Sequence, residues 1–243
     1  MAERPDRADG LPDEAWVREA TQFLLSLDPP DTASAAYLQA HSGRLAATVA
    51  MAPLPTASRR CLELGSYLQI APAMHCLLGY QVTAASLGPA GTKVRKAASR
   101  QGAVILDCDL DLFDVERDTF PYPDGHFELV LACELLEHLR TDPMHMLFEI
   151  YRVLERDGRI LLTTPNCANL LEAAGFRIEV LVTRPGRPVE IKDIIEDLLT
   201  AYGFPTDLRG EQVYCLARKL DNASRVRFPE FLYEKFSRDG AMR

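Results

Sequence analysis

The sequence predicts an α/β fold built on a mostly parallel sheet, and three observations support this prediction. Residues 127–133 and 159–164 are apolar runs with the length of buried strands. Between them, apolar residues recur at helical spacing, and Asp157-Gly158 is a typical helix end. A strand, a helix and a strand in about 40 residues form one βαβ unit, so the two strands should be parallel neighbours.

Length and composition indicate an ordinary globular protein. The chain has 243 residues, of which 47% are hydrophobic and 26% are charged, enough for one sizeable core. A formal net charge of -8 disfavours nonspecific binding to nucleic acids and to anionic membranes. The N-terminus is too polar for a signal peptide, and no apolar run is long enough to span a membrane. Six cysteines without a CxxC motif indicate reduced thiols, so we expect a cytoplasmic protein.

The remaining pattern predicts seven strands in one sheet. Five further strands are expected at residues 60–64, 81–85, 103–106, 176–182 and 212–217, the last of them inserted antiparallel. Helices are expected from about Asp13 to residue 27, at 32–51 after an Asp31 cap, at 88–100 as a basic outer helix, just after Asn166, and at 191–202.

These elements divide the chain into three parts. Residues 1–55 should form an N-terminal helical segment that covers the site. Residues 56–220 should form the α/β domain itself. Residues 221–243 are polar and are expected to be a tail or a short helix.

Parallel sheets bind ligands beyond the carboxyl ends of their strands, which directs attention to residues 63–67 and 133–138. Gly65 has no Cβ and would let a ligand approach the backbone closely. It is the only glycine present of a GxGxxG pattern, which disfavours a pyrophosphate site and a nicotinamide-dependent oxidoreductase. Glu63 stands just before this turn, and its negative charge suits a cationic ligand better than a phosphate.

Three segments carry a resemblance to a known family. They are LELGS at 62–66, FPYPDGHFELVLACELLEHL at 120–139 and LFEIYRVLERDGRILLTTPN at 147–166. The chain from Arg59 to Lys219 resembles the class I S-adenosylmethionine-dependent methyltransferases, in their small-molecule group of types 11 and 12. This resemblance implies a Rossmann-like, seven-stranded, mostly parallel sheet with helices on both faces, an antiparallel last strand and additional N-terminal helices.

The resemblance also implies residues that bind the cofactor S-adenosylmethionine. The loop of Glu63, Gly65, Ser66 and Tyr67 would border its methionine part, although the family pattern has more glycines there. Ser86 stands where the family carries an acid for the ribose. Asp109 and Leu110 match the adenine position, and Cys133 lies where the sulfonium would be.

The expected reaction is O-methylation of a small molecule or a sugar-containing metabolite. His138 is the candidate base, with Glu134 or Glu137 as its orienting partner. These three residues also resemble the ExxEH metal motif of ubiquinone-type O-methyltransferases and small-RNA 3′-terminal methyltransferases, where they would hold Mg²⁺ or Mn²⁺. The alternative is that they only pack and cap the following helix, and the favoured interpretation has no metal.

The acceptor is expected to be a small molecule, because the acidic composition argues against a large RNA footprint. The sequence does not indicate an oligomeric state. One departure from the family supports a competing hypothesis: only Cys167-Ala168-Asn169 stands where relatives carry an insertion over the acceptor pocket. The competing hypothesis is a catalytically degenerate binding or partner protein with the same fold.

Overall fold

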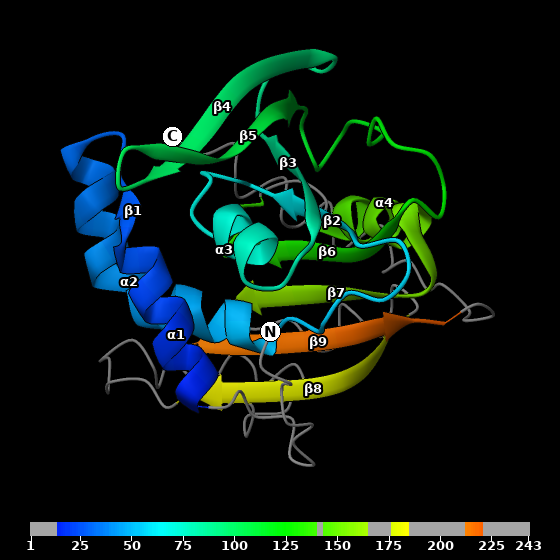
Figure 1. The fold of residues 1–243 in the computed structure, drawn as a ribbon. Coiled ribbons are helices and arrows are strands. Elements are labelled where there is room, and N and C mark those ends of the chain that lie inside the picture. Colours follow the sequence, from blue (N-terminus) through cyan, green and yellow to red (C-terminus); the bar gives the residue numbers. More distant parts are fainter. Residues whose placement is uncertain (1–13, 140–142, 165–175, 185–211, 221–243) are drawn as a thin grey trace, which may run out of the picture.

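A computed structural model of the chain describes residues 14–139, 143–164, 176–184 and 212–220. They form one nine-stranded sheet in the order β1-β4-β5-β3-β2-β6-β7-β9-β8, drawn in Figure 1. The strands are β1 (Leu27–Asp28), β2 (Arg60–Leu64), β3 (Gln81–Ser86), β4 (Thr92–Arg100), β5 (Ala103–Leu112), β6 (Phe127–Cys133), β7 (Leu154–Thr164), β8 (Phe176–Arg184) and β9 (Gln212–Lys219).

The topology confirms the predicted α/β class, but the sheet has nine described strands instead of the expected seven, because β1 and β4 extend it beyond β5. The five central strands β5, β3, β2, β6 and β7 are parallel. β9 is inserted antiparallel between β7 and β8, as predicted for the last strand. Successive strands are added on one side of β2 as β3 and β5 and on its other side as β6 and β7, which places a topological switch point at the carboxyl end of β2.

Both faces of the central sheet are covered by helices. β6 is buried along almost its whole length, and its alternate residues belong to different cores. Val130 and Ala132 pack with α4 (Pro143–Val153), whereas Leu129 and Leu131 pack with the opposite helices. Those helices are α1 (Glu14–Leu25), α2 (Thr32–Met51) and α3 (Ala71–Cys76), which lie together in Figure 1. The largely apolar sequence of β6 is thus explained by burial on both faces.

The N-terminal helices agree with the expectation. α2 begins after Asp31, whose carboxylate accepts a hydrogen bond from the Ser34 backbone N–H at 2.7 Å. This bond satisfies one of the donors that a helix start leaves open. α2 packs its C-terminal half into the core, and none of the described helices could span a membrane.

The basic segment 88–100 was predicted to be a helix, and this prediction is wrong. Residues 92–100 form β4, antiparallel to β5, which itself extends to Leu112 rather than ending at residue 106. Arg95 pairs with Asp107 and Asp109, and Lys93 pairs with Asp111, at distances of 2.8–3.2 Å. The charges alternate along both segments, so a hairpin brings opposite charges together across the strands.

α4 also ends earlier than expected, at Val153 rather than at Asp157-Gly158, because β7 already starts at Leu154. Asp157 has a φ of +59°, so the expected turn is present as an irregularity within the strand. The helices predicted after Asn166 and at 191–202, and the segments 1–13 and 221–243, lie outside the described residues. The five described cysteines are free thiols.

Candidate functional site

A cavity of about 910 Å³ lies at the carboxyl ends of β2, β3, β5 and β6. Its size is within the range of sites for cofactors and small molecules. The sheet ends contribute Glu63–Gly65, Ser86, Leu87, Phe113–Glu116 and Cys133–Leu135, and α2 with its preceding turn contributes Pro30, Asp31, Ala33, Ser34, Tyr37, Arg44 and Leu45. The N-terminal helical segment therefore forms one wall of the cavity at the switch point.

The loop after β2 holds a buried carboxyl group. Gly65 has a φ of +67°, a conformation that glycine adopts without strain. Glu63 is 6% exposed, and its Oε2 accepts a hydrogen bond of 2.6 Å from the Ser66 hydroxyl. That hydroxyl oxygen accepts in turn from the Leu68 backbone N–H at 3.1 Å. Burial raises the pKa of Glu63 to about 7 against the opposing effect of the Ser66 hydrogen bond.

An ion pair connects α2 to the end of β6 inside the cavity. Arg44 lies 3.1 Å from the Glu134 carboxylate, and both side chains are largely buried. Arg44 also donates a 2.7 Å hydrogen bond to the Tyr37 hydroxyl, and Glu134 accepts one of 2.7 Å from the Thr163 hydroxyl. Glu134 has a φ of +52°, which is strained for a residue other than glycine, and its N–H donates to the Thr163 carbonyl at 2.8 Å.

The expected catalytic residues are only partly brought together. His138 and Glu134 both line the cavity, and the Glu134 carboxylate contacts Arg44 and Thr163. Glu137 lies in the 3₁₀ helix Leu136–His138, and its side chain is outside the described part of the structure. Cys133 lines the cavity, and burial raises the pKa of its thiol well above the usual range, so this thiol is protonated.

The expected cofactor residues also divide into two sets. Gly65, Tyr67 and Ser86 line the cavity, whereas Ser66 lies behind it and contacts Glu63. Asp109 and Leu110 do not line it: Asp109 pairs with Arg95, and Leu110 is buried in a core. The reason is the extension of β5, which places Phe113 and Asp114, four residues further along the chain, at the cavity wall.

Three cavity residues, Arg44, Tyr37 and Lys96, were not among the site residues expected from the sequence. Arg44 and Tyr37 are seven residues apart on α2, with His41 between them, so a polar stripe at helical spacing was a usable signal. Lys96 lines the cavity because segment 88–100 is a strand, which the sequence prediction missed. Within the described residues, no cluster of histidine, cysteine and acidic side chains is arranged to hold a metal ion.

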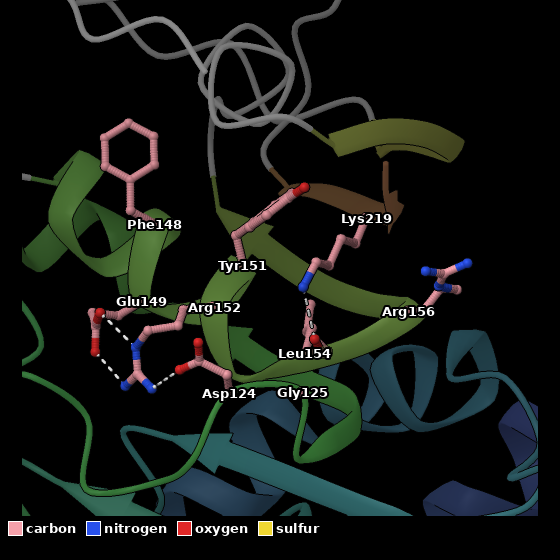
Figure 2. Close-up of a pocket in the computed structure, with 9 residues that line it drawn as sticks. All are labelled: Asp124, Gly125, Phe148, Glu149, Tyr151, Arg152, Leu154, Arg156 and Lys219. Carbon is pink, nitrogen blue, oxygen red and sulfur yellow. Dashed lines mark hydrogen bonds and ion pairs between the residues drawn. The ribbon is translucent and has the colours of Figure 1, made fainter. Parts of the chain in front are cut away.

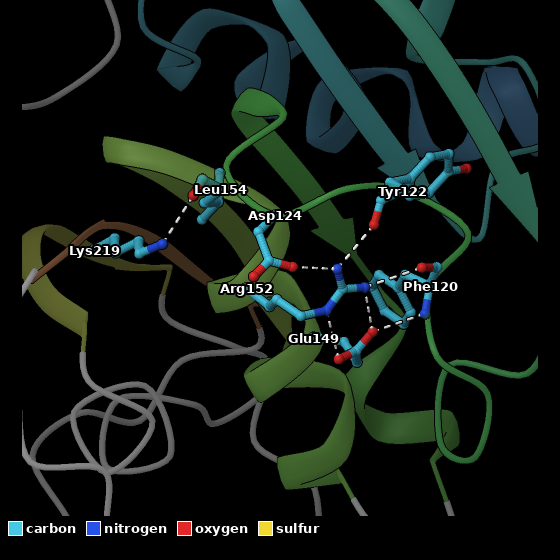
Figure 3. A network of polar contacts seen from close by, with 7 residues as sticks. All are labelled: Phe120, Tyr122, Asp124, Glu149, Arg152, Leu154 and Lys219. Carbon is cyan, nitrogen blue, oxygen red and sulfur yellow. Dashed lines mark hydrogen bonds and ion pairs between the residues drawn. The ribbon is translucent and has the colours of Figure 1, made fainter.

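A second cavity, of about 590 Å³, lies at the opposite end of the sheet and is shown in Figure 2. Figure 3 shows the network beside it, centred on Arg152. The guanidinium donates to both oxygens of Glu149, to Asp124, and to the carbonyls of Phe120 and Tyr122, at 2.7–3.0 Å. All five of its N–H groups are used, so this arrangement fixes the turn before β6.

Part of the chain matches a known protein family. Residues 62–162 match a family described as a methyltransferase domain, and no curated protein matches the chain.

Solved structures are similar to this chain at low sequence identity. A chain of the complex between the Haloferax volcanii Trm112 methyltransferase activator and a candidate methyltransferase is 12% identical, with a TM-score of 0.51 over 88% of this chain and 99% of that one. The (4+2)-cyclase SpnF is 18% identical, with a TM-score of 0.49 over 84% and 96% of the two chains. A candidate methyltransferase from Bacillus halodurans is 18% identical, with a TM-score of 0.45 over 72% and 98%.

Proposed function

We propose that this chain, which belongs to the class I S-adenosylmethionine-dependent methyltransferases through residues 62–162, methylates an oxygen atom of a small molecule or a sugar-containing metabolite. The observation that carries the proposal is the composition of the cavity at the switch point. It combines a buried carboxyl group on the cofactor loop, Glu63, with an adjacent cation and anion, Arg44 and Glu134.

These residues fit the chemistry of S-adenosylmethionine. The methionine part of this cofactor carries an ammonium and a carboxylate, and its sulfur is a sulfonium that makes the methyl group electrophilic. Glu63 offers a negative charge for which the described residues supply no ion-pair partner, and Arg44 offers a guanidinium for a carboxylate. No phosphate has to be held, so the loop at Gly65 does not need further glycines.

At the nucleoside end, the proposal rests on the wall formed by β3, β4 and β5. Ser86 and Lys96 would face the ribose, and Phe113 and Asp114 would border the adenine instead of Asp109 and Leu110. An aromatic ring and a carboxylate suit an adenine, because the ring can stack on the base and the carboxylate can accept from its amino group.

Methyl transfer mainly requires alignment of the acceptor and the exclusion of water, and an oxygen acceptor must also lose a proton. His138 lines the cavity and is the proposed base. Glu134, held by Arg44 and Thr163, would accept a hydrogen bond from the acceptor rather than orient His138. Tyr37 and the start of α2 would contact the acceptor from the opposite wall.

The proposal is tested in two steps. Calorimetric titration with S-adenosylhomocysteine should show binding, and absence of binding at millimolar ligand would exclude the proposed function. Methyl-labelled S-adenosylmethionine incubated with a low-molecular-weight metabolite fraction should then label an O-methylated product. The variant His138→Ala should lower this labelling by about 100-fold or more, with the affinity for S-adenosylhomocysteine unchanged.

A second candidate function is a catalytically degenerate binding or partner protein. Ser86 and Lys96 favour it, because neither is the acid that the family uses for the ribose. It predicts binding of S-adenosylhomocysteine without transfer to any acceptor, so labelling of a product by the wild-type protein would exclude it. The acidic composition and the free thiols support a cytoplasmic location for either function.

A further inference from the structure

Arg44 places a fixed cation at the segment of the chain that resembles a metal-binding motif. Glu134, Glu137 and His138 carry this resemblance, and Glu134 and His138 both line the cavity at the switch point. Arg44 lines the same cavity from α2, and its guanidinium lies 3.1 Å from Glu134 Oε2. Arg44 is outside residues 62–162, the part of the chain that matches the methyltransferase family. This cation therefore belongs to the N-terminal helices of this chain and not to the matched segment.

Both carboxylate oxygens of Glu134 are engaged by donors. Oε2 lies beside Arg44, and Oε1 accepts a hydrogen bond of 2.7 Å from the Thr163 hydroxyl. The Glu134 N–H also donates to the Thr163 carbonyl at 2.8 Å, which holds the residue at its φ of +52°. A divalent cation binds carboxylate oxygens directly, at about 2.1 Å for Mg²⁺. A metal ion on Glu134 would therefore have to compete with donors that are already in place.

The position of Arg44 also opposes a second cation. A Mg²⁺ ion on Glu134 Oε2 would lie at most about 5 Å from the guanidinium nitrogen, because the two distances of about 2.1 Å and 3.1 Å add to that value. The side chains of Arg44 and Glu134 are only 16% and 23% exposed, so water screens charges weakly there. Like charges at this separation repel each other. The described residues thus fit a guanidinium at Glu134 better than they fit a divalent metal ion.

Arg44 is itself held in place on α2. Its Nη2 donates a 2.7 Å hydrogen bond to the Tyr37 hydroxyl, and the Tyr37 ring lies against that of His41, with centroids 4.4 Å apart. α2 in turn is anchored by its C-terminal half, which is buried in the core. A planar guanidinium with five N–H groups can bind Tyr37 and Glu134 together. Arg44 can therefore orient the Glu134 carboxylate as a bound cation would.

We propose that Arg44 takes the place of a divalent cation at Glu134, so that this chain positions its acceptor without a metal ion. Glu134, held by Arg44 and Thr163, accepts a hydrogen bond from the acceptor, and Arg44 acts through it as a positioning residue. The inference rests on the proposed function and deepens it, because it assigns the cation of the acceptor site to a residue of the N-terminal helices.

The first test measures Mn²⁺ binding to the full chain, without cofactor or acceptor, from the loss of the electron paramagnetic resonance signal of the free ion. Arg44→Met should bind Mn²⁺ at least about tenfold more tightly than the wild type, because the repelling guanidinium is gone. Arg44→Lys retains a cation and should bind Mn²⁺ as weakly as the wild type. Wild-type binding as tight as that of Arg44→Met would overturn the inference.

Further variants locate the ion. Arg44→Met/Glu134→Gln lacks the carboxylate and should bind Mn²⁺ no more tightly than the wild type. Arg18→Met removes an exposed ion pair with Glu14, 3.7 Å apart, and should also bind Mn²⁺ like the wild type. Tight binding by the double variant would place the ion away from Glu134 and overturn the inference. Circular dichroism checks the fold of each variant, and Arg44→Gln, which is also uncharged, replaces Arg44→Met if that variant does not fold.

The second test measures methyl transfer after metal ions have been removed with EDTA, from labelled S-adenosylmethionine to the metabolite fraction. Labelling by the wild type should change by less than about twofold. Arg44→Lys should retain more labelling than Arg44→Met, and added Mn²⁺ should raise the labelling by Arg44→Met alone. A loss of about tenfold or more in the chelated wild type, restored by Mg²⁺ or Mn²⁺, would overturn the inference.

The inference and the proposed function fail in different ways. If the wild-type protein neither binds S-adenosylhomocysteine nor labels a product, the proposed function is wrong, and the Mn²⁺ titrations still decide whether Arg44 excludes a metal ion. If the wild-type protein labels a product only in the presence of a divalent cation, the proposed function stands and the role of Arg44 is overturned.

Discussion

Arg44 of α2 lies 3.1 Å from Glu134 at the end of β6, and this ion pair joins the N-terminal helices to the sheet inside the candidate site. The two side chains are only 16% and 23% exposed, so their interaction is weakly screened by water. The pair therefore contributes to the stability of the domain and to the charge of the cavity at the same time.

The variant Arg44→Met removes the guanidinium that lies 3.1 Å from the partly buried Glu134 carboxylate. We expect the free energy of unfolding to fall by about 1–3 kcal/mol in urea titrations at neutral pH. Arg18→Met removes an exposed pair with Glu14, 3.7 Å apart, and is the matched control, with an expected change below about 0.5 kcal/mol. The double variant Arg44→Met/Glu134→Gln should recover part of the loss, and equal effects of the Arg44 and Arg18 variants would contradict the prediction.

Glu63 should make stability depend on pH even without ligand. Burial raises its pKa from 4.5 to about 7. Between these pH values the folded state therefore binds more protons than the unfolded state. The contribution of Glu63 to the free energy of unfolding is therefore fully present below about pH 4.5. It is lost as the pH rises through 7, and the loss is on the order of 3 kcal/mol. Glu63→Gln should be more stable than the wild type at about pH 8, with the difference vanishing near pH 5.

Urea unfolding at both pH values checks this prediction. Glu14→Gln changes an exposed acid and should follow the wild type at each pH. A Glu63→Gln variant that is less stable than the wild type at pH 8 would show that the buried carboxylate has a stabilising partner.

Gly65 and Gly79 both have positive φ values, +67° and +82°, but only Gly65 lines the cavity. Alanine at either position should cost about 1–2 kcal/mol of stability, because a Cβ is unfavourable in this conformation. A Cβ on Gly65 would also reach 3.4 Å from Leu135, whereas a Cβ on Gly79 meets nothing within 4 Å. Gly65→Ala should therefore weaken binding of S-adenosylhomocysteine by about tenfold or more in calorimetry, corresponding to about 1.4 kcal/mol, and Gly79→Ala should leave it unchanged.

Arg152 supports the turn before β6, far from the candidate site. Arg152→Met should destabilise the protein by about 2–4 kcal/mol, because Glu149 and two backbone carbonyls lose the hydrogen bonds that the guanidinium donates. Arg95→Met, which removes exposed cross-strand pairs, should cost less than about 1 kcal/mol. Urea unfolding measures both, and a larger loss for Arg95 would mean that the β4–β5 hairpin stabilises the domain more than the Arg152 network does.

Much of the architecture was predictable from local patterns. The run from Phe127 to Cys133 is apolar except for Glu128 because β6 is covered on both faces, and this pattern can be recognised without knowledge of distant residues. Asp31 and Gly65 were also identified from the sequence, because helix capping and a positive φ each favour particular residue types. The position of the site followed from the parallel topology.

Segment 88–100 and the partners of Glu134 were decided only by tertiary structure. A basic stretch with Lys93 and Arg95 reads locally as a solvated helix, and it becomes a strand because the acids of β5 lie opposite it. β5 pairs with this strand as far as Leu112. As a result Asp114, and not Asp109, lines the cavity, and Lys96 lines it as well.

The sequence by itself thus determined the α/β fold, the βαβ unit at its centre and the strand ends where a ligand would bind, because these depend on periodicity and on single residues with special backbone preferences. Only the tertiary structure showed that Arg44 is an ion-pair partner of Glu134, and that Glu63 is buried without an ion-pair partner among the described residues. Charge pairing and desolvation depend on which residues distant in sequence meet, and 90 residues separate Arg44 from Glu134 in the chain (134 − 44).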